Sequence, residues 1–226
     1  TEAIRSIEKY CIERDVPVRL FGVMKEHEEW LNEHMPGQFT VTYNPDVADY
    51  VYDRKKLVAL SGKKYHSKKN HINKFKRACD SWAYEPITKD NVSECLAMLS
   101  EWKEINSVDR DYDKYAESCV ARKSLINLSM LGEKGGLIRA DGRIVAFTIG
   151  EKINSDTFVV HIEKAFADVP GAYAIVNQQF LEHEAGDCLY VNREDDAGEE
   201  GLRQAKVSYH PLFMIEKGLA VKKNDH

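Results

Sequence analysis

The sequence predicts a protein of mixed α/β class, in which helices cover both faces of one mixed, twisted sheet. Helical and strand-like hydrophobic patterns alternate along the chain. Asp141-Gly142 separates two apolar alternating runs, which is typical of a β-hairpin. Hydrophobic residues are 43% and charged residues 31% of the 226 residues, a balance that favours a globular chain over a disordered one.

The first sixty residues predict helices that alternate with short strands. A helix is expected around Ile4 to Cys11, where apolar residues fall at helical spacing. The segments that follow are a strand at Val18–Val23, a charged helix from Lys25 to about His34, a strand at Gln38–Tyr43, a strand at Tyr50–Tyr52 and an apolar segment at Leu57–Leu60.

A basic segment follows, Ser61 to Arg77, with seven bases and no acid among them. Without those seven, the chain has 25 basic and 37 acidic residues, so its positive charge is concentrated here. Lysines mixed with aromatic residues suit a polyanion such as a nucleotide, a tRNA or lipid headgroups. A solvated helix face is the plainer alternative.

A second series of elements begins at Trp82, in the order β-α-α-β-β-β-α-β-α-β. It comprises a strand at Trp82–Tyr84, helices at Asn91–Ile105 and Tyr115–Met130, the hairpin strands Gly136–Ala140 and Arg143–Lys152, a strand at Thr157–Ala165, a helix from Pro170 to about Glu184, a strand at Cys188–Asn192, a helix after it, and a last strand at Leu212–Val221. We therefore expect three parts: residues 1–60, a basic linker 61–81, and a domain 82–226.

Composition excludes several classes of protein. The net charge of −5 gives no global case for nucleic-acid binding, no apolar run is long enough to span a bilayer, and no signal segment opens the chain. The five cysteines are far apart and the eight histidines form no metal-binding pattern. We expect reduced thiols, a cytoplasmic location and no metal site.

Two polar side chains mark the strand Thr157–Ala165 as a candidate site. His161 and Glu163 share one face of this strand, because side chains alternate. Groups of this type are the usual acid–base candidates. A satisfied ion pair at a sheet edge is the structural alternative.

The stretch from Leu189 to Pro211 passes from a strand into a charged helix. Asp196 and Glu199 fit a capping box, which explains part of the acidity. Capping does not explain Asn192, Arg193 and Glu194 at the strand end. Lys206 and Tyr209 lie further along, near the helix end, although a surface helix with a core tyrosine would also fit.

Three blocks together resemble a known family: HIEKAFAD with the Gly171-Ala-Tyr173 helix start, YVNREDDAGEEGLRQAKVSYHP, and LSGKKYHSKKNHINKFKR. They are similar to the C-terminal domain of phosphatidylglycerol lysyltransferases, a group related to the Fem-type aminoacyltransferases. The resemblance covers roughly residues 45 to 221. It implies tandem folds of the GNAT (N-acetyltransferase-like) type.

Under this resemblance, residues 82–226 form a complete GNAT-like domain and residues 1–60 a partial one. The absence of the opening strands and of an initiator Met leads us to expect a truncated chain. The helix that starts at Gly171 takes the place of the phosphate-binding helix. An acetyl-CoA enzyme usually has a glycine-rich loop there, whereas this chain has Asp168-Val-Pro-Gly171. This departure disfavours acetyl-CoA and is compatible with aminoacyl-tRNA as the donor.

The predicted function is therefore acyl transfer, more specifically aminoacyl transfer from aminoacyl-tRNA to an amine or hydroxyl acceptor, which could be a small molecule or a lipid headgroup. The alternatives are an acyl-CoA-dependent N-acyltransferase and a non-catalytic nucleotide- or RNA-binding module. The candidate catalytic residues are Glu163, His161, Tyr209 and Lys206. The candidates for substrate binding are Asn192, Arg193, Glu194, Lys164 and Tyr173, and those for the donor phosphates are Lys63, Lys64, Lys68, Lys69, Asn70 and Gly171.

Overall fold

The computed structural model describes residues 2–108 and 112–223, and these form two compact units. One unit comprises Thr1–Tyr50, Glu194–Lys206 and Phe213–His226, and the other comprises Val51–Arg193 and Val207–Leu212. Sequence patterns placed the boundaries near residues 60 and 81. The observed division is different, because the last strand returns to pair with two strands from the beginning of the chain.

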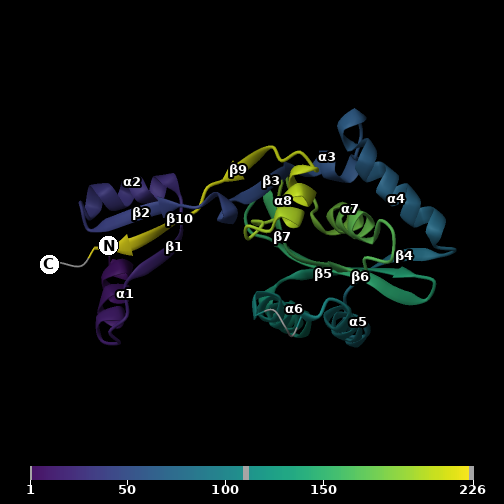
Figure 1. The fold of residues 1–226 in the computed structure, drawn as a ribbon, viewed down its shortest axis with the longest axis horizontal. Helices are drawn as coiled ribbons and strands as arrows, with labels where there is room; N and C mark the ends of the chain where they lie inside the picture. Colours follow the sequence, from purple (N-terminus) through teal and green to yellow (C-terminus); the bar gives the residue numbers. More distant parts are fainter. Residues whose placement is uncertain (1, 109–111, 224–226) are drawn as a thin grey trace. The chain divides into compact units, whose positions relative to one another are not determined.

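The first unit is built on a three-stranded antiparallel sheet of order β1-β10-β2 (Figure 1). Its elements are α1 (Glu2–Ile12), β1 (Arg19–Val23), α2 (Lys25–His34), β2 (Phe39–Tyr43), the 3-10 turn η1 (Pro45–Val47) and β10 (Gly218–Lys222). Leu31 of α2, Phe39 of β2 and Ala220 of β10 belong to one buried cluster. Apolar side chains at helical spacing in α2 and at alternate positions in the strands produce this core.

A seven-stranded mixed sheet has the order β4-β5-β6-β7-β8-β3-β9, and its strands β4 to β8 belong to the second unit. The strands are β3 (Asp49–Asp53), β4 (Trp82–Pro86), β5 (Lys134–Ala140), β6 (Arg143–Lys152), β7 (Thr157–Ala165), β8 (Tyr190–Asn192) and β9 (Phe213–Ile215). Strands β7 and β8 are parallel, whereas the pairs β4–β5, β5–β6 and β6–β7 are antiparallel. The division between the two units falls within β3 and just before β9.

Helices cover both faces of this sheet (Figure 1). Helix α7 (Ala172–Glu184) lies on one face with α3 (Arg54–Ala59) and α4 (His66–Ala78) beside it, and α5 (Val92–Ile105) and α6 (Tyr112–Leu131) lie on the other. The short turn η2 (Lys63–Tyr65) leads into α4, and α8 (Glu200–Val207) follows β8. The predicted class, a mixed α/β sheet with helices on both faces, is confirmed.

Three local predictions differ from the structure. The first three residues of Leu57–Leu60 belong to helix α3, and Leu60 is its C-cap. Asp53 caps the first turn of α3, since its carboxylate accepts from the Lys56 N–H at 3.0 Å. The basic segment is a helix rather than a linker, and α4 packs Ile72 and Phe75 into the interior. The single last strand is two short strands, β9 and β10, which lie in different sheets.

The feature that positions the candidate site is the early end of the pairing between β7 and β8. Their register runs from Thr157 opposite Tyr190 to Val159 opposite Asn192, where β8 ends. Strand β7 continues to Ala165 and stays paired with β6 along that length. Its later half therefore borders an opening in the sheet on the side where β8 has ended.

Candidate functional site

An ion pair between Glu163 and Arg193 joins the two strands across this opening. Glu163 lies four residues beyond the last paired position of β7, which is about 13 Å along the strand. Arg193 directly follows β8, and its Nη2 atom contacts the Glu163 carboxylate. The two side chains are only 13% and 12% exposed, so this is a buried ion pair. Glu163 Oε1 is buried and accepts no hydrogen bond from the described residues.

Three further side chains complete a cluster around Arg193. Its guanidinium carbon lies 4.9 Å from the ring centre of Tyr209 and 5.9 Å from that of Tyr52. The ammonium nitrogen of Lys68 lies 4.1 Å from the Tyr209 ring centre. We call these five residues, Tyr52, Lys68, Glu163, Arg193 and Tyr209, the Arg193 cluster. It combines residues from β3, α4, β7 and the segments that follow β8 and α8.

The Arg193 cluster perturbs its own titratable groups. Burial raises the pKa of Tyr209 to about 12, and Glu163 adds to this rise while Arg193 opposes it. Burial lowers the pKa of Lys68, and the nearby positive charge of Arg193 lowers it further. Burial would also lower the pKa of Arg193, but the Glu163 carboxylate more than offsets this, so the net shift is upward. Tyr209 is therefore a protonated phenol at neutral pH.

The Tyr209 hydroxyl has no hydrogen-bond partner among the described residues. The side chain is 7% exposed, and within the described chain its hydroxyl forms no hydrogen bond. Most buried tyrosine hydroxyls find a partner. A protonated hydroxyl beside a buried ion pair can donate a hydrogen bond or a proton to a substrate oxygen.

The other candidates on β7 have contacts of their own. His161 Nε2 lies 3.2 Å from Glu151 Oε1 on β6, within ion-pair distance. Lys164 is buried: it donates to Glu117 of α6 at 2.6 Å and its ammonium lies 4.3 Å from the Trp102 ring centre. Since neighbouring side chains on a strand point to opposite faces, Lys164 faces away from Glu163. Tyr173, in the first turn of α7, is 44% exposed.

The lysines expected to bind donor phosphates belong to η2 and α4. Lys63, Lys64 and Lys69 are exposed, and Asn70 contacts His66 at 3.3 Å. In the described part of the chain, no carboxylate forms an ion pair with any of the seven bases of this segment (Lys63, Lys64, Lys68, Lys69, Lys74, Lys76 and Arg77). No described carboxylate therefore neutralises their charge. Of the seven, Lys68 is the one that lies in the Arg193 cluster.

Gly171 has a packing role at the start of α7. Its φ of +82° is in the left-handed region, and a Cβ atom there would lie 2.1 Å from the carbonyl oxygen of His71. Only glycine permits this approach of α7 to the backbone of α4. The glycine is thus explained without a phosphate.

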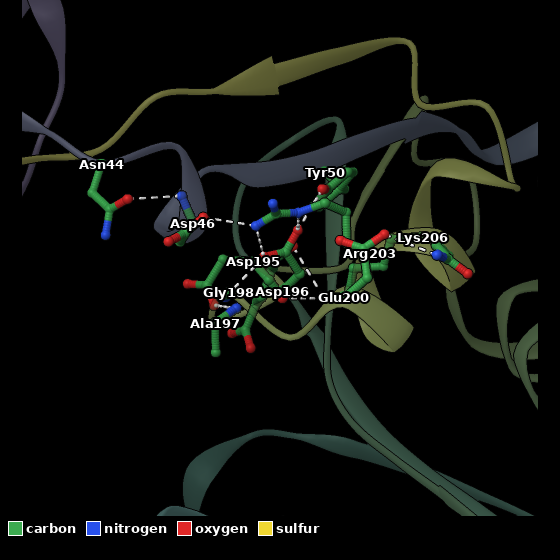
Figure 2. Close-up of polar contacts among 12 residues, drawn as sticks. Asn44, Asp46, Tyr50, Asp195, Asp196, Ala197, Gly198, Glu200, Arg203 and Lys206 are labelled. Carbon is green, nitrogen blue, oxygen red and sulfur yellow. Dashed lines mark hydrogen bonds and ion pairs between the residues drawn. The ribbon is translucent and has the colours of Figure 1, made fainter.

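The loop after Arg193 is held by a network of charged residues in the first unit (Figure 2). Arg203 donates to both carboxylate oxygens of Asp196, at 2.8 and 2.9 Å, and to Asp46 at 2.7 Å. The Tyr50 hydroxyl donates to Asp196 at 2.6 Å. Lys206 is buried and donates to the main-chain carbonyls of Glu194 and Asp195. Figure 2 shows Arg203 between Asp46 and Asp196.

These contacts correct the expected capping box. Helix α8 begins at Glu200, and the Asp196 side chain accepts from the Gly198 N–H at 2.9 Å and from Arg203 rather than from Glu199. Its main-chain oxygen accepts from the Glu199 N–H at 2.8 Å. The loop contains Glu194 and Ala197 at φ values of +57° and +50°, which are uncommon for residues other than glycine. The Asp196 carboxylate thus holds this strained loop in place through its hydrogen bonds from Arg203.

Sequence reasoning missed Tyr52 and did not separate Lys68 from the other lysines. Tyr52 is 1% exposed and lies on β3, the neighbour of β8 in the sheet. A buried tyrosine in a strand is usual in a core, so the sequence carried no signal for its role. Asn192 is buried at the end of β8, in register with Val51 and Val159.

Comparison with known families decides the relationship. The family described as phosphatidylglycerol lysyltransferase, C-terminal, matches residues 1–220. The chain belongs to this family. The resemblance inferred from the three sequence blocks is confirmed.

Individual proteins are also similar to the chain. A crystal structure of a conserved protein of unknown function from Bacteroides thetaiotaomicron is 37% identical, with a TM-score of 0.92, over 98% of this chain and 75% of that one. The structure of L-PGS from Bacillus licheniformis is 15% identical, with a TM-score of 0.67, over 98% and 73%. The uncharacterized protein MYCGA3080 of Mycoplasmoides gallisepticum is 27% identical over 76% of this chain, which spans 55% of that protein's length.

The fold also resembles that of GNAT proteins. A tandem GNAT protein from the clavulanic acid biosynthesis pathway has a TM-score of 0.51 at 6% identity, over 99% of this chain and 69% of that one. The expectation of a GNAT-like fold is thereby confirmed. Among residues 2–108 and 112–223, no helix has both the length and the apolar character needed to cross a bilayer.

Proposed function

We propose that this chain is an acyltransferase domain that transfers an aminoacyl group from an aminoacyl-tRNA to an amine or hydroxyl acceptor. The observation that carries the proposal is the Arg193 cluster at the opening between β7 and β8. There, a protonated tyrosine hydroxyl without a partner in the described chain lies beside a buried carboxylate with one unused oxygen atom. General acid–base catalysis of acyl transfer uses these two kinds of group, a proton donor and a proton acceptor.

In the proposed reaction, Tyr209 and Glu163 each take part in one proton transfer. The acceptor nitrogen or oxygen attacks the carbonyl carbon of the aminoacyl ester, and the bond from that carbon to the ribose oxygen breaks. Tyr209 donates its proton to the departing ribose oxygen. Oε1 of Glu163 takes the proton that the acceptor loses, and solvent returns that proton to Tyr209. Arg193 orients Glu163 and stabilises the negative charge that develops on the carbonyl oxygen.

The basic face of α4 supports a nucleic-acid donor. Its bases form no ion pair with the described carboxylates, and the rest of the chain is acidic. A polyanion would neutralise this charge. The start of α7 gives little support to acyl-CoA, because Gly171 is occupied in packing against α4 and Asp168 precedes it. The description of the family supports a lipid acceptor, and a small-molecule acceptor is the alternative within this proposal.

Transfer of a radiolabelled aminoacyl group from tRNA tests the proposal. Acceptors in the assay are phosphatidylglycerol vesicles and water-soluble amines. Tyr209→Phe should lower kcat by about 10²- to 10⁴-fold with KM almost unchanged, because it removes only the proton donor. Tyr112→Phe, which changes a tyrosine that is 84% exposed, is the matched control and should keep the wild-type rate.

The alternatives give different results in the same assay. Transfer of an acyl group from acyl-CoA, with no transfer from aminoacyl-tRNA, would identify acyl-CoA as the donor and contradict this part of the proposal. RNA binding without transfer, unchanged in Tyr209→Phe and Glu163→Gln, would indicate a non-catalytic RNA-binding module instead.

A further inference from the structure

Lys68 differs from the other bases of its segment in its surroundings. Lys69, the next residue, is exposed, whereas Lys68 is partly buried with its ammonium 4.1 Å from the centre of the Tyr209 ring. No described carboxylate forms an ion pair with Lys68. The one acid in the Arg193 cluster, Glu163, is already engaged by Arg193.

The Arg193 cluster therefore holds an excess of positive charge. Lys68 and Arg193 lie near the same tyrosine ring, at 4.1 and 4.9 Å from its centre, and the one carboxylate of the cluster, Glu163, pairs with Arg193. Partly buried charge without a counter-ion is unfavourable, so the cluster is arranged to receive an anion. When no anion is bound, the Tyr209 ring stabilises the Lys68 ammonium.

We propose that Lys68 is the binding residue for one phosphate group of the substrate and that it holds the end of a polyanion at the Tyr209 hydroxyl. This inference rests on the proposed function, because it names the phosphate contact of that same site. The exposed bases of α4 attract the polyanion along the helix, and Lys68 fixes its last phosphate in the cluster. A phosphate suits the place better than a carboxylate, because the neighbouring bases of α4 would accompany a chain of phosphates.

The first test uses the wild-type protein and the reactivity of its lysine amines. Acetylation of each lysine is followed by mass spectrometry with and without adenosine 5′-monophosphate. At about ten times its dissociation constant, the nucleotide should slow acetylation of Lys68 about tenfold, because only the free fraction reacts. Acetylation of Lys69 should stay unchanged. Equal protection of both lysines, or protection of neither, would overturn the inference.

The second test compares two variants with the same change of charge. Lys68→Met should weaken nucleotide binding at least about tenfold, since a hydrogen bond to a charged group is lost, whereas Lys69→Met should weaken it less than about twofold. Lys68→Arg should retain binding, because the charge remains. Inorganic phosphate should compete with the nucleotide, and acetate at the same ionic strength should not. Competition by acetate to the same degree would identify a carboxylate site and contradict the phosphate assignment.

Neither test requires transfer activity, so the two proposals can fail separately. Selective protection of Lys68 without aminoacyl transfer would leave the phosphate site standing and remove the proposed reaction. Transfer that proceeds normally in Lys68→Met would remove the phosphate site alone.

Discussion

At the scale of single residues, the Arg193 cluster is sensitive to substitutions that remove only one member of the Arg193–Glu163 ion pair. Both side chains are nearly buried, and the Glu163 carboxylate is an ionic partner of the guanidinium. Removing a single member of such a pair leaves the other charge buried without compensation. Removing both members together avoids that cost.

Glu163→Gln should therefore destabilise the fold by about 3 kcal/mol in addition to its effect on transfer. The double variant Glu163→Leu with Arg193→Met should lose less stability than Glu163→Gln, because no buried charge remains. Urea unfolding of the two variants measures the difference. A double variant that is less stable than the single one would show that the pair stabilises the fold by itself.

Asp196 is the second residue whose charge matters. Hydrogen bonds from Arg203 hold its pKa well below the usual range, against the effect of burial. Asp196→Asn should lower the free energy of unfolding by about 2 kcal/mol, the cost of losing charged hydrogen bonds. Glu199→Gln, an exposed charge-matched change in the same loop, should have almost no effect.

The contribution of Asp196 also has a predictable pH dependence. Its folded-state pKa is lower than the unfolded value of about 3.9, so its contribution to stability is complete above that value. The contribution is lost as the pH falls toward the folded-state pKa. In urea unfolding at acid pH, the difference in free energy of unfolding between wild type and Asp196→Asn should become smaller. A difference that stays constant from pH 6 down to the lowest pH measured would contradict this.

At the scale of elements, the contact of α7 with α4 depends on one glycine. Gly171→Ala places a Cβ atom 2.1 Å from the His71 carbonyl oxygen and also keeps an unfavourable φ of +82°. Gly186→Ala changes a glycine at φ +54° with no atom within 4 Å of the new Cβ. The second variant should lose about 1 kcal/mol, the cost of the backbone conformation alone, and Gly171→Ala clearly more. If the two variants lose equal stability in thermal unfolding, α4 must move away from the new Cβ atom at no cost in free energy.

Elements with a strong local signal could be predicted from the sequence. Helix α2 and strand β7 begin and end at the expected residues, and the Asp141-Gly142 hairpin joins β5 to β6. The division of the last strand into β9 and β10 could not be predicted, because each is fixed by the sheet it joins. The sequence likewise named Glu163, Arg193, Tyr209 and Lys68 as candidates, whereas it did not single out Tyr52. The contacts that bring Lys68 to Tyr209 and Tyr52 to Arg193 cross more than one hundred residues of chain.

At the scale of the whole molecule, the segregation of charge is the feature with a functional consequence. The chain carries a net charge of −5, yet one helix and the turn before it hold seven bases without a described ionic partner. Binding of a polyanion to this face should release counter-ions, so its affinity should fall steeply with salt. Net charge alone would predict repulsion of RNA.

A pair of variants with the same net charge separates these two possibilities. In one variant Lys69, Lys74, Lys76 and Arg77 of α4 become glutamine, and in the other Lys9, Lys89, Lys123 and Lys134, all exposed residues outside α4, become glutamine. The first should lose most of its affinity for tRNA and most of the dependence of affinity on salt, since each base removed from the contact lowers the slope by about 1. The second should bind with nearly the wild-type slope, because its lost charges lie outside the contact. Filter binding of tRNA at a series of salt concentrations gives both slopes. Similar slopes in the two variants would show that RNA follows the overall charge of the chain rather than the face of α4.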